Sequence, residues 1–380
     1  MASKLVNSAI PDEARARNTH LAESTHPAMA GTDGERYDVV VIGGGAAGLS
    51  GALALSRARR SVLVIDAGEQ RNLPAGHVHN YLGREGTPPA DLLAIGRDEV
   101  ASYGGKVVAG RVTAAQAQKG DQPGFVVTLD EGREVSARRL LNTTGLVDEL
   151  PAVPGLRERW GRDVLHCPYC HGWEVRDQAL GVIASNGFAA HQALMFRQWS
   201  EDIKLFLNGG PAPSEEESKQ LAARGIAVVT AVIEGIVVEG DRITGVRLAS
   251  GEMVVRRALV VSPRTTARAE VLSSLGIDPV EQEMNGIVFG TVMPADPTGA
   301  TAVPGVWVAG NVADIRAQVI SSAAAGLNVA AMINADLIAE DTRMAVAARR
   351  SQLAMFDKPN WDDERYPTAA DQTRDSPESP

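Results

Sequence analysis

Short apolar stretches rich in β-branched residues alternate with glycine-rich turns and Ala/Leu-rich stretches along this chain. This pattern is typical of strands that alternate with helices. The first unit predicts four elements, a strand at Tyr37–Ile42, a glycine-rich turn over 43–48, a helix ending near Ser56 and a strand at Ser61–Ile65. Strand, turn, helix and strand in this order indicate a βαβ unit with parallel strands.

A second unit of the same kind follows later in the chain. It predicts a strand at Leu180–Ile183, a helix at Ala189–Trp199 and a strand at Ile203–Leu207. An acidic helix at Ser214–Leu221 and short strands over 226–262 come next. We therefore expect an α/β protein with two Rossmann-like, three-layer dinucleotide-binding domains.

Composition and charge narrow the class of protein. The chain has 380 residues, 44% of them hydrophobic, and a formal net charge of −10. The length suits two domains, and the acidic balance gives no indication of a nucleic-acid partner. The apolar run Val39–Leu55 is interrupted by glycines and fits strand, loop and helix better than a membrane span. With no secretory signal pattern at the start, we expect a soluble cytoplasmic protein.

The first glycine turn carries a dinucleotide-binding fingerprint. Gly43, Gly45 and Gly48 give Gly-x-Gly-x-x-Gly between the first strand and helix, and Asp66 ends the second strand. In this motif the first glycine allows the tight turn, the second lets the backbone approach a pyrophosphate, and the third allows close helix–strand packing. The acidic residue would bond a ribose hydroxyl. An ordinary glycine-rich turn is the weaker alternative.

Both FAD and NAD use this fingerprint, and the layout of the chain favours FAD. The motif opens the folded part, and a strand at Arg138–Asn142 leads into Thr143-Thr144-Gly145. Residues 305–312 predict a late strand that ends in Gly310-Asn311, before an Ala-rich helix from about Gln318. The Gly-Asn pair could hold a ribityl hydroxyl. Backbone N–H groups of Gln318 and Val319 could face the flavin pyrimidine oxygen.

The two cysteines of the chain form the strongest candidate for chemistry. Cys167 and Cys170 are three residues apart, with His166 and His171 beside them. Two thiols at this spacing can close into a disulfide and reopen, and a neighbouring base favours the reactive thiolate. A pair of structural cysteines and half of a zinc site are the alternatives. A zinc site would need two more ligands, and there is no second cysteine pair. We expect no metal.

The turn of the second unit departs from the nucleotide-binding pattern. It reads Ala184-Ser185-Asn186-Gly187-Phe188-Ala189, so Ala184 and Asn186 stand where the two glycines belong. A side chain at Asn186 would intrude where a pyrophosphate must approach the backbone. The following strand offers neither an acid for a ribose nor arginines for a 2′-phosphate. The alternative is that NAD(P)H is still bound, because Gly187 can bend the chain.

Over about residues 37–340 the sequence resembles the low-molecular-weight thioredoxin reductase family, in the glycine motif, Thr143-Thr144-Gly145, Cys167-x-x-Cys170 and Gly310-Asn311. It departs from that family at His171, where an acid is usual, at the second glycine turn, and at Asn311, where the family has Asp. These departures resemble the branch of dithiol oxidases that close disulfides in microbial natural products, of the gliotoxin and holomycin kind.

The resemblance implies a thioredoxin reductase-like fold with a discontinuous FAD domain, and a homodimer. The expected segments are a disordered leader over 1–35, FAD-binding parts over 36–147 and 263–340, a central degenerate NAD(P)-binding-like domain over 148–262 that carries the cysteines, and a helix end with a loose tail over 341–380. The residues expected to bind FAD are Gly43, Gly45, Ala46, Ala47, Gly48, Asp66, Asn72, Asn80, Val112, Thr144, Gly145, Gly310, Asn311, Gln318 and Val319.

The implied activity is an FAD-dependent dithiol oxidase that closes a disulfide in a small-molecule dithiol, uses O2, forms H2O2 and needs no NADPH. Cys167 and Cys170 would exchange disulfides with the substrate, Cys170 lying nearer the flavin, and His171 would act as the base. Tyr169 and Trp173 either form a wall of the substrate cavity or pack between domains. The alternatives are a disulfide reductase fed by NADPH or ferredoxin, and a flavin redox sensor or dithiol-sequestering protein.

Overall fold

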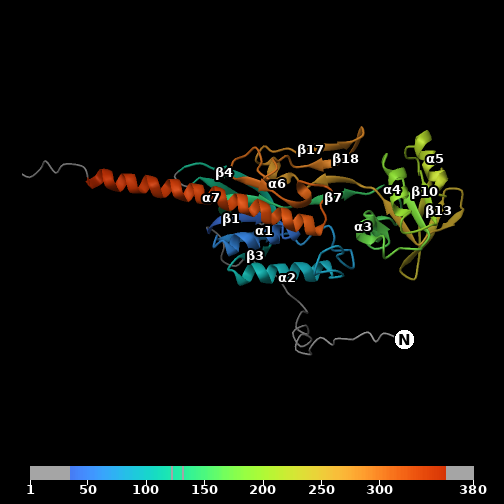
Figure 1. Ribbon diagram of the computed structural model, residues 1–380, viewed down its shortest axis with the longest axis horizontal. Helices are drawn as coiled ribbons and strands as arrows, with labels where there is room; N and C mark the ends of the chain where they lie inside the picture. Colours follow the sequence, from blue (N-terminus) through green and yellow to red (C-terminus); the bar gives the residue numbers. More distant parts are fainter. Residues whose placement is uncertain (1–34, 121–122, 131, 357–380) are drawn as a thin grey trace, which may run out of the picture. The chain divides into compact units, whose positions relative to one another are not determined.

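The computed structural model describes residues 35–120, 123–130 and 132–356. The chain divides into two compact units, one that ends at Asn334 and one that begins at Ala335. The elements that surround the candidate site belong to the first unit, and Figure 1 labels β1, α1, α3 and α4 among them. The last helix, α7 (Val319–Phe356), starts in the first unit and continues into the second.

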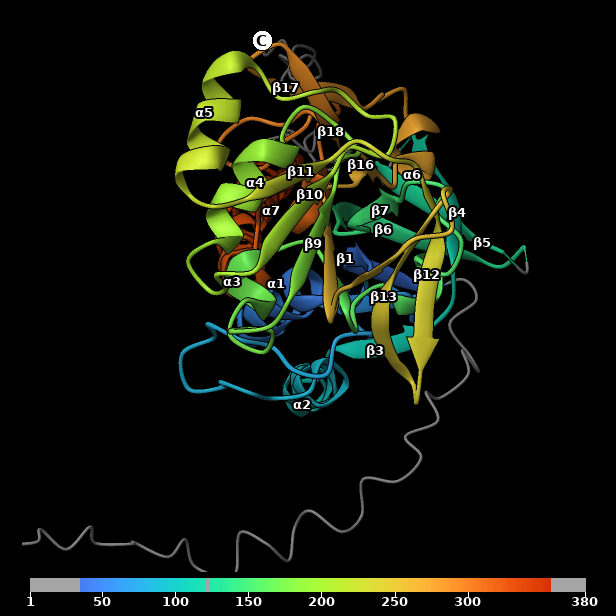
Figure 2. The same ribbon diagram turned by 90° about the vertical axis from the view of Figure 1, so that its right-hand side faces the viewer.

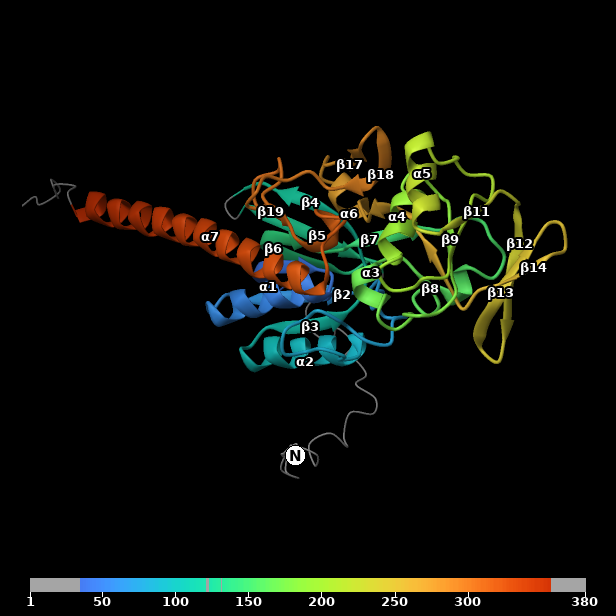
Figure 3. The same ribbon diagram turned by 45° about the vertical axis from the view of Figure 1, so that its right-hand side comes forward.

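The largest sheet contains the first glycine turn. Its strand order is β3-β2-β1-β6-β5-β4, and β19 also pairs with β6. The strands are β1 (Arg36–Ile42), β2 (Val62–Asp66), β3 (Lys106–Ala109), β4 (Val112–Gln118), β5 (Gly124–Leu129), β6 (Glu134–Asn142) and β19 (Val306–Val308). Strands β1, β2, β3, β6 and β19 are parallel; β5 pairs antiparallel with β6, and β4 pairs antiparallel with β5. The helices α1 (Ala46–Arg57) and α2 (Pro89–Ser102) pack against each other beside this sheet (Figure 3).

The apolar, β-branched composition of β1 explains its place in the middle of the sheet. Val39, Val40 and Val41 are completely buried, as expected for a parallel strand covered on both faces. Strand β19 reaches the same sheet from more than 160 residues further along the chain than β6, pairing Val306 with Leu140 and Val308 with Asn142. A smaller sheet of order β17-β18-β16-β7 adjoins this part. It consists of β7 (Leu146–Glu149), β16 (Arg264–Ala267), β17 (Val280–Met284) and β18 (Ile287–Val292), with the short helix α6 (Glu270–Ser273) following β16.

The central segment has its own parallel sheet of order β11-β10-β9-β15-β8 and a three-stranded antiparallel sheet of order β12-β13-β14. Figure 2 shows β9, β10 and β11 side by side. The strands are β8 (Val164–Leu165), β9 (Leu180–Ile183), β10 (Ile203–Phe206), β11 (Ala227–Val229), β12 (Ile233–Glu239), β13 (Arg242–Leu248), β14 (Met253–Val255) and β15 (Ala258–Val261). The helices are α3 (Pro168–His171), α4 (Ala189–Phe196) and α5 (Glu215–Ala223).

The predicted α/β fold with two Rossmann-like units is confirmed. The strand predicted at Leu180–Ile183 has those bounds, and the helix predicted at Ala189–Trp199 ends three residues earlier, at Phe196. Ser214 lies outside its helix as the N-cap, and its side chain exchanges hydrogen bonds with Glu217 in a capping box. The predicted leader over 1–35 and the tail from Phe356 fall mostly outside the described residues.

Judged by length and composition alone, one helix of the described residues, α7 over Val319–Leu353, could cross a membrane. The core helix of a soluble protein passes the same test, and 39% of the relevant stretch is buried within the protein. This property alone is weak evidence for a membrane.

Candidate functional site

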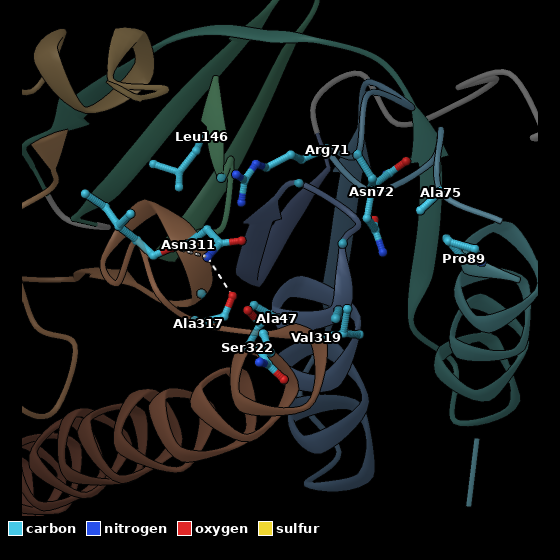
Figure 4. Close-up of a pocket in the computed structure, with 18 of the residues that line it drawn as sticks. Ala47, Arg71, Asn72, Ala75, Pro89, Leu146, Asn311, Ala317, Val319 and Ser322 are labelled. Carbon is cyan, nitrogen blue, oxygen red and sulfur yellow. Dashed lines mark hydrogen bonds between the residues drawn. The ribbon is translucent and has the colours of Figure 1, made fainter. Parts of the chain in front are cut away.

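A cavity of about 730 Å³ extends from the glycine turn after β1 to the disulfide at α3. Its lining combines residues of the first sheet, of the loop after β2, of α3 and α4, and of the start of α7. Figure 4 shows one part of it, where Asn311, Ala317, Val319 and Ser322 face the loop that carries Arg71 and Asn72. A cavity of this size suits a dinucleotide cofactor or a large small molecule.

The glycine turn has the geometry that the fingerprint requires. Gly43 has φ +103°, and its N–H donates to the Ile65 carbonyl at 2.9 Å. A Cβ at Gly48 would lie 2.0 Å from the Gly43 carbonyl oxygen, so only glycine allows α1 to pack this closely. A Cβ at Gly45 would meet only Gln70 Cγ, at 3.9 Å, on a backbone that lines the cavity. The space beside Gly45 is therefore open, as a pyrophosphate cradle must be.

Asp66, at the end of β2, is buried and already has protein partners. Its carboxylate accepts hydrogen bonds from the Gly44 N–H at 3.0 Å and from Gln70 Nε2 at 2.7 Å. These bonds tie the glycine turn to β2 and fix the carboxylate at the cavity wall. Since a carboxylate can accept about four hydrogen bonds, it retains capacity for a ribose hydroxyl.

The late segment completes the cavity at its other end. Gly310 has φ +79°, and a Cβ there would lie 2.8 Å from Ala47 Cβ, so β19 can turn closely over α1. Asn311 Nδ2 donates to the carbonyls of Asp314, Ile315 and Ala317, at 3.0, 3.3 and 2.8 Å. Figure 4 shows the bond to Ala317. An aspartate could not donate these bonds, so asparagine shapes the loop that leads to Gln318 and α7. The backbone at Val319 then starts the helix at the cavity wall.

Taken together, these features fit FAD. The open backbone at Gly45, the buried carboxylate of Asp66 and the helix start at Val319 all line the same cavity. The glycine turn would hold the FAD pyrophosphate, and the cofactor would supply two-electron redox chemistry to the cavity that the disulfide also lines.

The two cysteines lie at the cavity, on the one-turn helix α3 that follows β8. They form a disulfide with a Cα–Cα distance of 5.3 Å, and both line the cavity. Cys167 is the N-cap of α3, and its Sγ accepts a hydrogen bond from the Cys170 N–H at 3.2 Å. In the reduced protein this bond would favour the thiolate of Cys167 over its thiol.

Both histidines beside the cysteines are poised to be neutral. Burial lowers the pKa of His171, and neither of its ring nitrogens has a hydrogen-bond partner among the described residues. Burial, with a smaller contribution from the Arg71 guanidinium, lowers the pKa of His166. His166 Nδ1 lies 3.2 Å from the Val261 carbonyl, which assigns the proton of the neutral ring to Nδ1. A neutral imidazole can accept a proton from a thiol.

Most of the predicted residues come together here. Of those named from the sequence, the following line the cavity: Gly43, Gly45, Ala46, Ala47, Asp66, Asn72, Val112, Thr144, Gly145, Cys167, Cys170, His171, Gly310, Asn311, Gln318 and Val319. Gly48 lies behind the lining, in the packing role expected of it. Asn80 also lies outside the lining, and its side chain instead donates to the Tyr169 carbonyl at 2.7 Å.

Several polar residues of the cavity lining could not be predicted from the sequence. Arg71 forms a bidentate ion pair with Asp148, both bonds 2.7 Å, across 77 positions. Glu69 lies between Arg111 and Arg268, which come from two other segments. Gln192 of α4 donates to the carbonyls of His166 and Val261. Each is an unremarkable polar residue in the sequence, and only the fold brings its partners together.

The two aromatic residues near the disulfide face solvent. Tyr169 is 63% exposed and Trp173 is 65% exposed, so neither is packed between domains here. Tyr169 lines the cavity and contacts the edge of Trp199, with ring centroids 5.8 Å apart. The guanidinium of Arg176 lies 4.0 Å from the ring centroid of Trp173. Of the two, Tyr169 is the one that lines the cavity with the disulfide.

A cavity lined by a dinucleotide-binding glycine turn, with a Cys-x-x-Cys disulfide in the same lining, is the arrangement expected of a flavin-dependent disulfide oxidoreductase. The sequence matches the pyridine nucleotide-disulphide oxidoreductase family over residues 37–328, and the chain belongs to that family. It is therefore an FAD-binding oxidoreductase of the thioredoxin reductase-like type.

The alignments with individual relatives extend over almost the whole length of each relative. The crystal structure of HlmI aligns with a TM-score of 0.78 and 43% identity, over 83% of this chain and 97% of that one. An oxidoreductase from Agrobacterium tumefaciens aligns with a TM-score of 0.73 and 37% identity, over 80% and 99%. Thioredoxin reductase sirT from Leptosphaeria maculans is 29% identical over 332 residues, which is 84% of this chain and 98% of sirT.

Proposed function

We propose that this protein is a dithiol oxidase that closes an intramolecular disulfide in a small natural-product dithiol, with O2 as the electron acceptor and without NADPH. The net reaction converts one dithiol and one O2 into one cyclic disulfide and one H2O2, so that two electrons and two protons leave the substrate. Similarity to the structure of HlmI and to thioredoxin reductase sirT supports disulfide chemistry, and the sequence resemblance to dithiol oxidases supports a small-molecule dithiol as substrate.

The observation that carries the proposal is the turn after β9, where a nicotinamide dinucleotide would have to bind. The Asn186 side chain accepts a hydrogen bond from the Phe188 N–H at 3.0 Å and donates to the Ser262 carbonyl at 2.9 Å. A backbone donor at the start of α4 is thus already satisfied from within the protein. This contrasts with Gly45, whose surroundings are open.

The neighbouring glycine is also covered. A Cβ at Gly187 would lie 2.5 Å from Ile287 Cδ1, so the side chain of Ile287 packs against this turn. A pyrophosphate at the turn would have to displace Ile287 and break the Asn186 hydrogen bonds. The protein therefore lacks an accessible phosphate cradle at its second βαβ unit, which favours the substrate dithiol over NADPH as the source of electrons.

The disulfide and its neighbours can carry out the exchange. One substrate thiolate attacks a sulfur of the Cys167–Cys170 disulfide, breaks the S–S bond and forms a mixed disulfide with that cysteine. The second substrate thiolate then attacks the substrate sulfur of the mixed disulfide and displaces the cysteine thiolate, which leaves both cysteines reduced and the substrate as a cyclic disulfide. Neutral His171 accepts a substrate proton, and Tyr169 contacts the substrate body at the mouth of the cavity. FAD, when bound, supplies the two-electron chemistry that returns the cysteines to the disulfide and hands the electrons to O2.

The test is to mix the purified holoprotein with either NADPH or a small dithiol such as dithiothreitol in the absence of oxygen, while following flavin absorbance. We expect loss of the oxidised flavin band with the dithiol, none with NADPH, and H2O2 release when air is admitted. Rapid bleaching by NADPH would instead identify a reductase. A protein that resists both would have to be a ferredoxin-dependent reductase, a sensor or a dithiol-sequestering protein.

A further inference from the structure

The loop over residues 77–87, which follows β2, reaches the helix that carries the cysteines. Asn80 Nδ2 donates to the Tyr169 carbonyl at 2.7 Å. His79 Nε2 lies 3.4 Å from Glu174 Oε1, just beyond the other end of α3. The 77–87 loop therefore contacts both α3 and the segment that follows it. The Asn80 bond joins residues that are 89 positions apart in the sequence.

The loop is itself firmly built. Val78 pairs with Thr87, through bonds from the Val78 N–H to the Thr87 carbonyl at 2.8 Å and from the Gly86 N–H to the Val78 carbonyl at 2.9 Å. The Glu85 carboxylate contacts His79 Nδ1 at 2.6 Å and accepts the Asn80 N–H at 2.8 Å. Asn80 has φ +60°, a conformation that asparagine tolerates better than most residues. These bonds aim the Asn80 amide at α3.

We propose that Asn80 is a positioning residue that holds the Cys167–Cys170 disulfide at the FAD cavity. Tyr169 lies between the two cysteines on α3, a helix of one turn. The last four carbonyls of any helix lack partners within it, so the Tyr169 carbonyl needs a donor from elsewhere. By satisfying the Tyr169 carbonyl, Asn80 fixes the backbone between the two sulfur atoms. The proposal rests on electron transfer from the cysteine pair to FAD, which is part of the proposed function.

The experiment compares two variants and one control. Asn80→Gly keeps the positive φ and removes the amide donor, whereas Asn80→Asp keeps the shape and places an acceptor against the Tyr169 carbonyl. Asn285→Gly is the matched control, because Asn285 also has positive φ but lies exposed in the turn between β17 and β18. Loss of one hydrogen bond predicts flavin reduction by dithiothreitol that is slower by about threefold to tenfold in both Asn80 variants. FAD content and thermal midpoint should stay unchanged, and the control should behave as wild type.

Hydrogen exchange gives a second readout that needs no turnover. Amides of the segment 166–174 should exchange faster in both Asn80 variants and at the wild-type rate in Asn285→Gly. Unchanged flavin reduction and unchanged exchange would overturn the proposal. Loss of FAD from the Asn80 variants would also overturn it, since it would show a cofactor contact instead. If dithiothreitol fails to reduce even the wild-type flavin, the proposed function falls and hydrogen exchange alone decides the role of Asn80.

Discussion

Gly45 and Gly48 lie three residues apart in the same turn, yet the structure predicts opposite consequences for their replacement by alanine. At Gly45 the nearest atom to a new Cβ is Gln70 Cγ, 3.9 Å away, and the backbone has φ −78°, which alanine adopts freely. At Gly48 the new Cβ would lie 2.0 Å from the Gly43 carbonyl oxygen. The first change meets open cavity and the second meets backbone.

The expected magnitudes follow from these distances. Gly45→Ala should change the free energy of unfolding of the apoprotein by less than about 1 kcal/mol, because it adds no clash and alters only an N-cap. The added methyl group would occupy the pyrophosphate approach, and overpacking of about 1–3 kcal/mol corresponds to FAD binding weaker by about fivefold to 150-fold. Gly48→Ala should lower the stability of the protein by about 3 kcal/mol or more, since carbonyl and helix cannot separate without moving β1.

The assay measures the two quantities separately. Apoprotein stability is obtained from denaturant unfolding, and FAD affinity from titration of the apoprotein followed by flavin fluorescence. The matched control is Gly76→Ala, because nothing lies within 4 Å of a Cβ at Gly76 and its φ is not positive. Gly68 is unsuitable because its φ of +73° would strain an alanine. The reasoning would be refuted by a Gly45→Ala protein that binds FAD as tightly as wild type, or by a Gly48→Ala protein of undiminished stability.

Three further predictions concern the disulfide and its histidines. Cys170→Ser should abolish dithiol oxidation, measured as peroxide release, while FAD stays bound and the protein stays yellow. Turnover above about one-hundredth of the wild-type rate would contradict disulfide exchange at the cysteine pair. His171→Ala should slow flavin reduction by dithiol about tenfold or more with little loss of stability, and an unchanged rate would remove it as the base. Because burial holds the pKa of His166 below its ordinary 6.5, the unfolded chain binds more protons under acid conditions, so the free energy of unfolding should fall as the pH drops below about 6.5. His166→Asn, which can still donate to the Val261 carbonyl, should flatten that slope in urea titrations, and an identical slope would exclude His166 as its source.

Local signals in the sequence were enough to predict the fold. The change from β-branched strand to glycine turn to Ala/Leu-rich helix placed β1, and the end of α1, within one residue of their observed bounds. The helix itself begins earlier than expected, at Ala46, inside the predicted turn over 43–48. The glycine spacing, Asp66, the cysteine pair and the late Gly310-Asn311 were all readable, because each depends on a few adjacent residues. Most of the predicted cofactor residues line one cavity for the same reason.

What the sequence could not predict depends on contacts between distant segments. Arg71 and Asp148 are two ordinary charged residues until β7 brings them together. The family resemblance implied Asn80 as an FAD contact, and no sequence pattern indicated that its side chain donates to the Tyr169 carbonyl, 89 positions away. Whether Tyr169 and Trp173 were exposed or packed between domains also depended on the fold, and no pattern of neighbouring residues carried that information.

The late return of β19 to the first sheet has a consequence for biosynthesis. The central sheet is assembled from strands between Val164 and Val261, so that part can fold as soon as those residues have left the ribosome. The cofactor cavity instead needs Gly43 near the start and Ser322 far along the chain. Flavin loading must therefore wait until Ser322 has been synthesised, and a chain truncated after Val261 would contain the strands of the central sheet and both cysteines without the complete cofactor cavity.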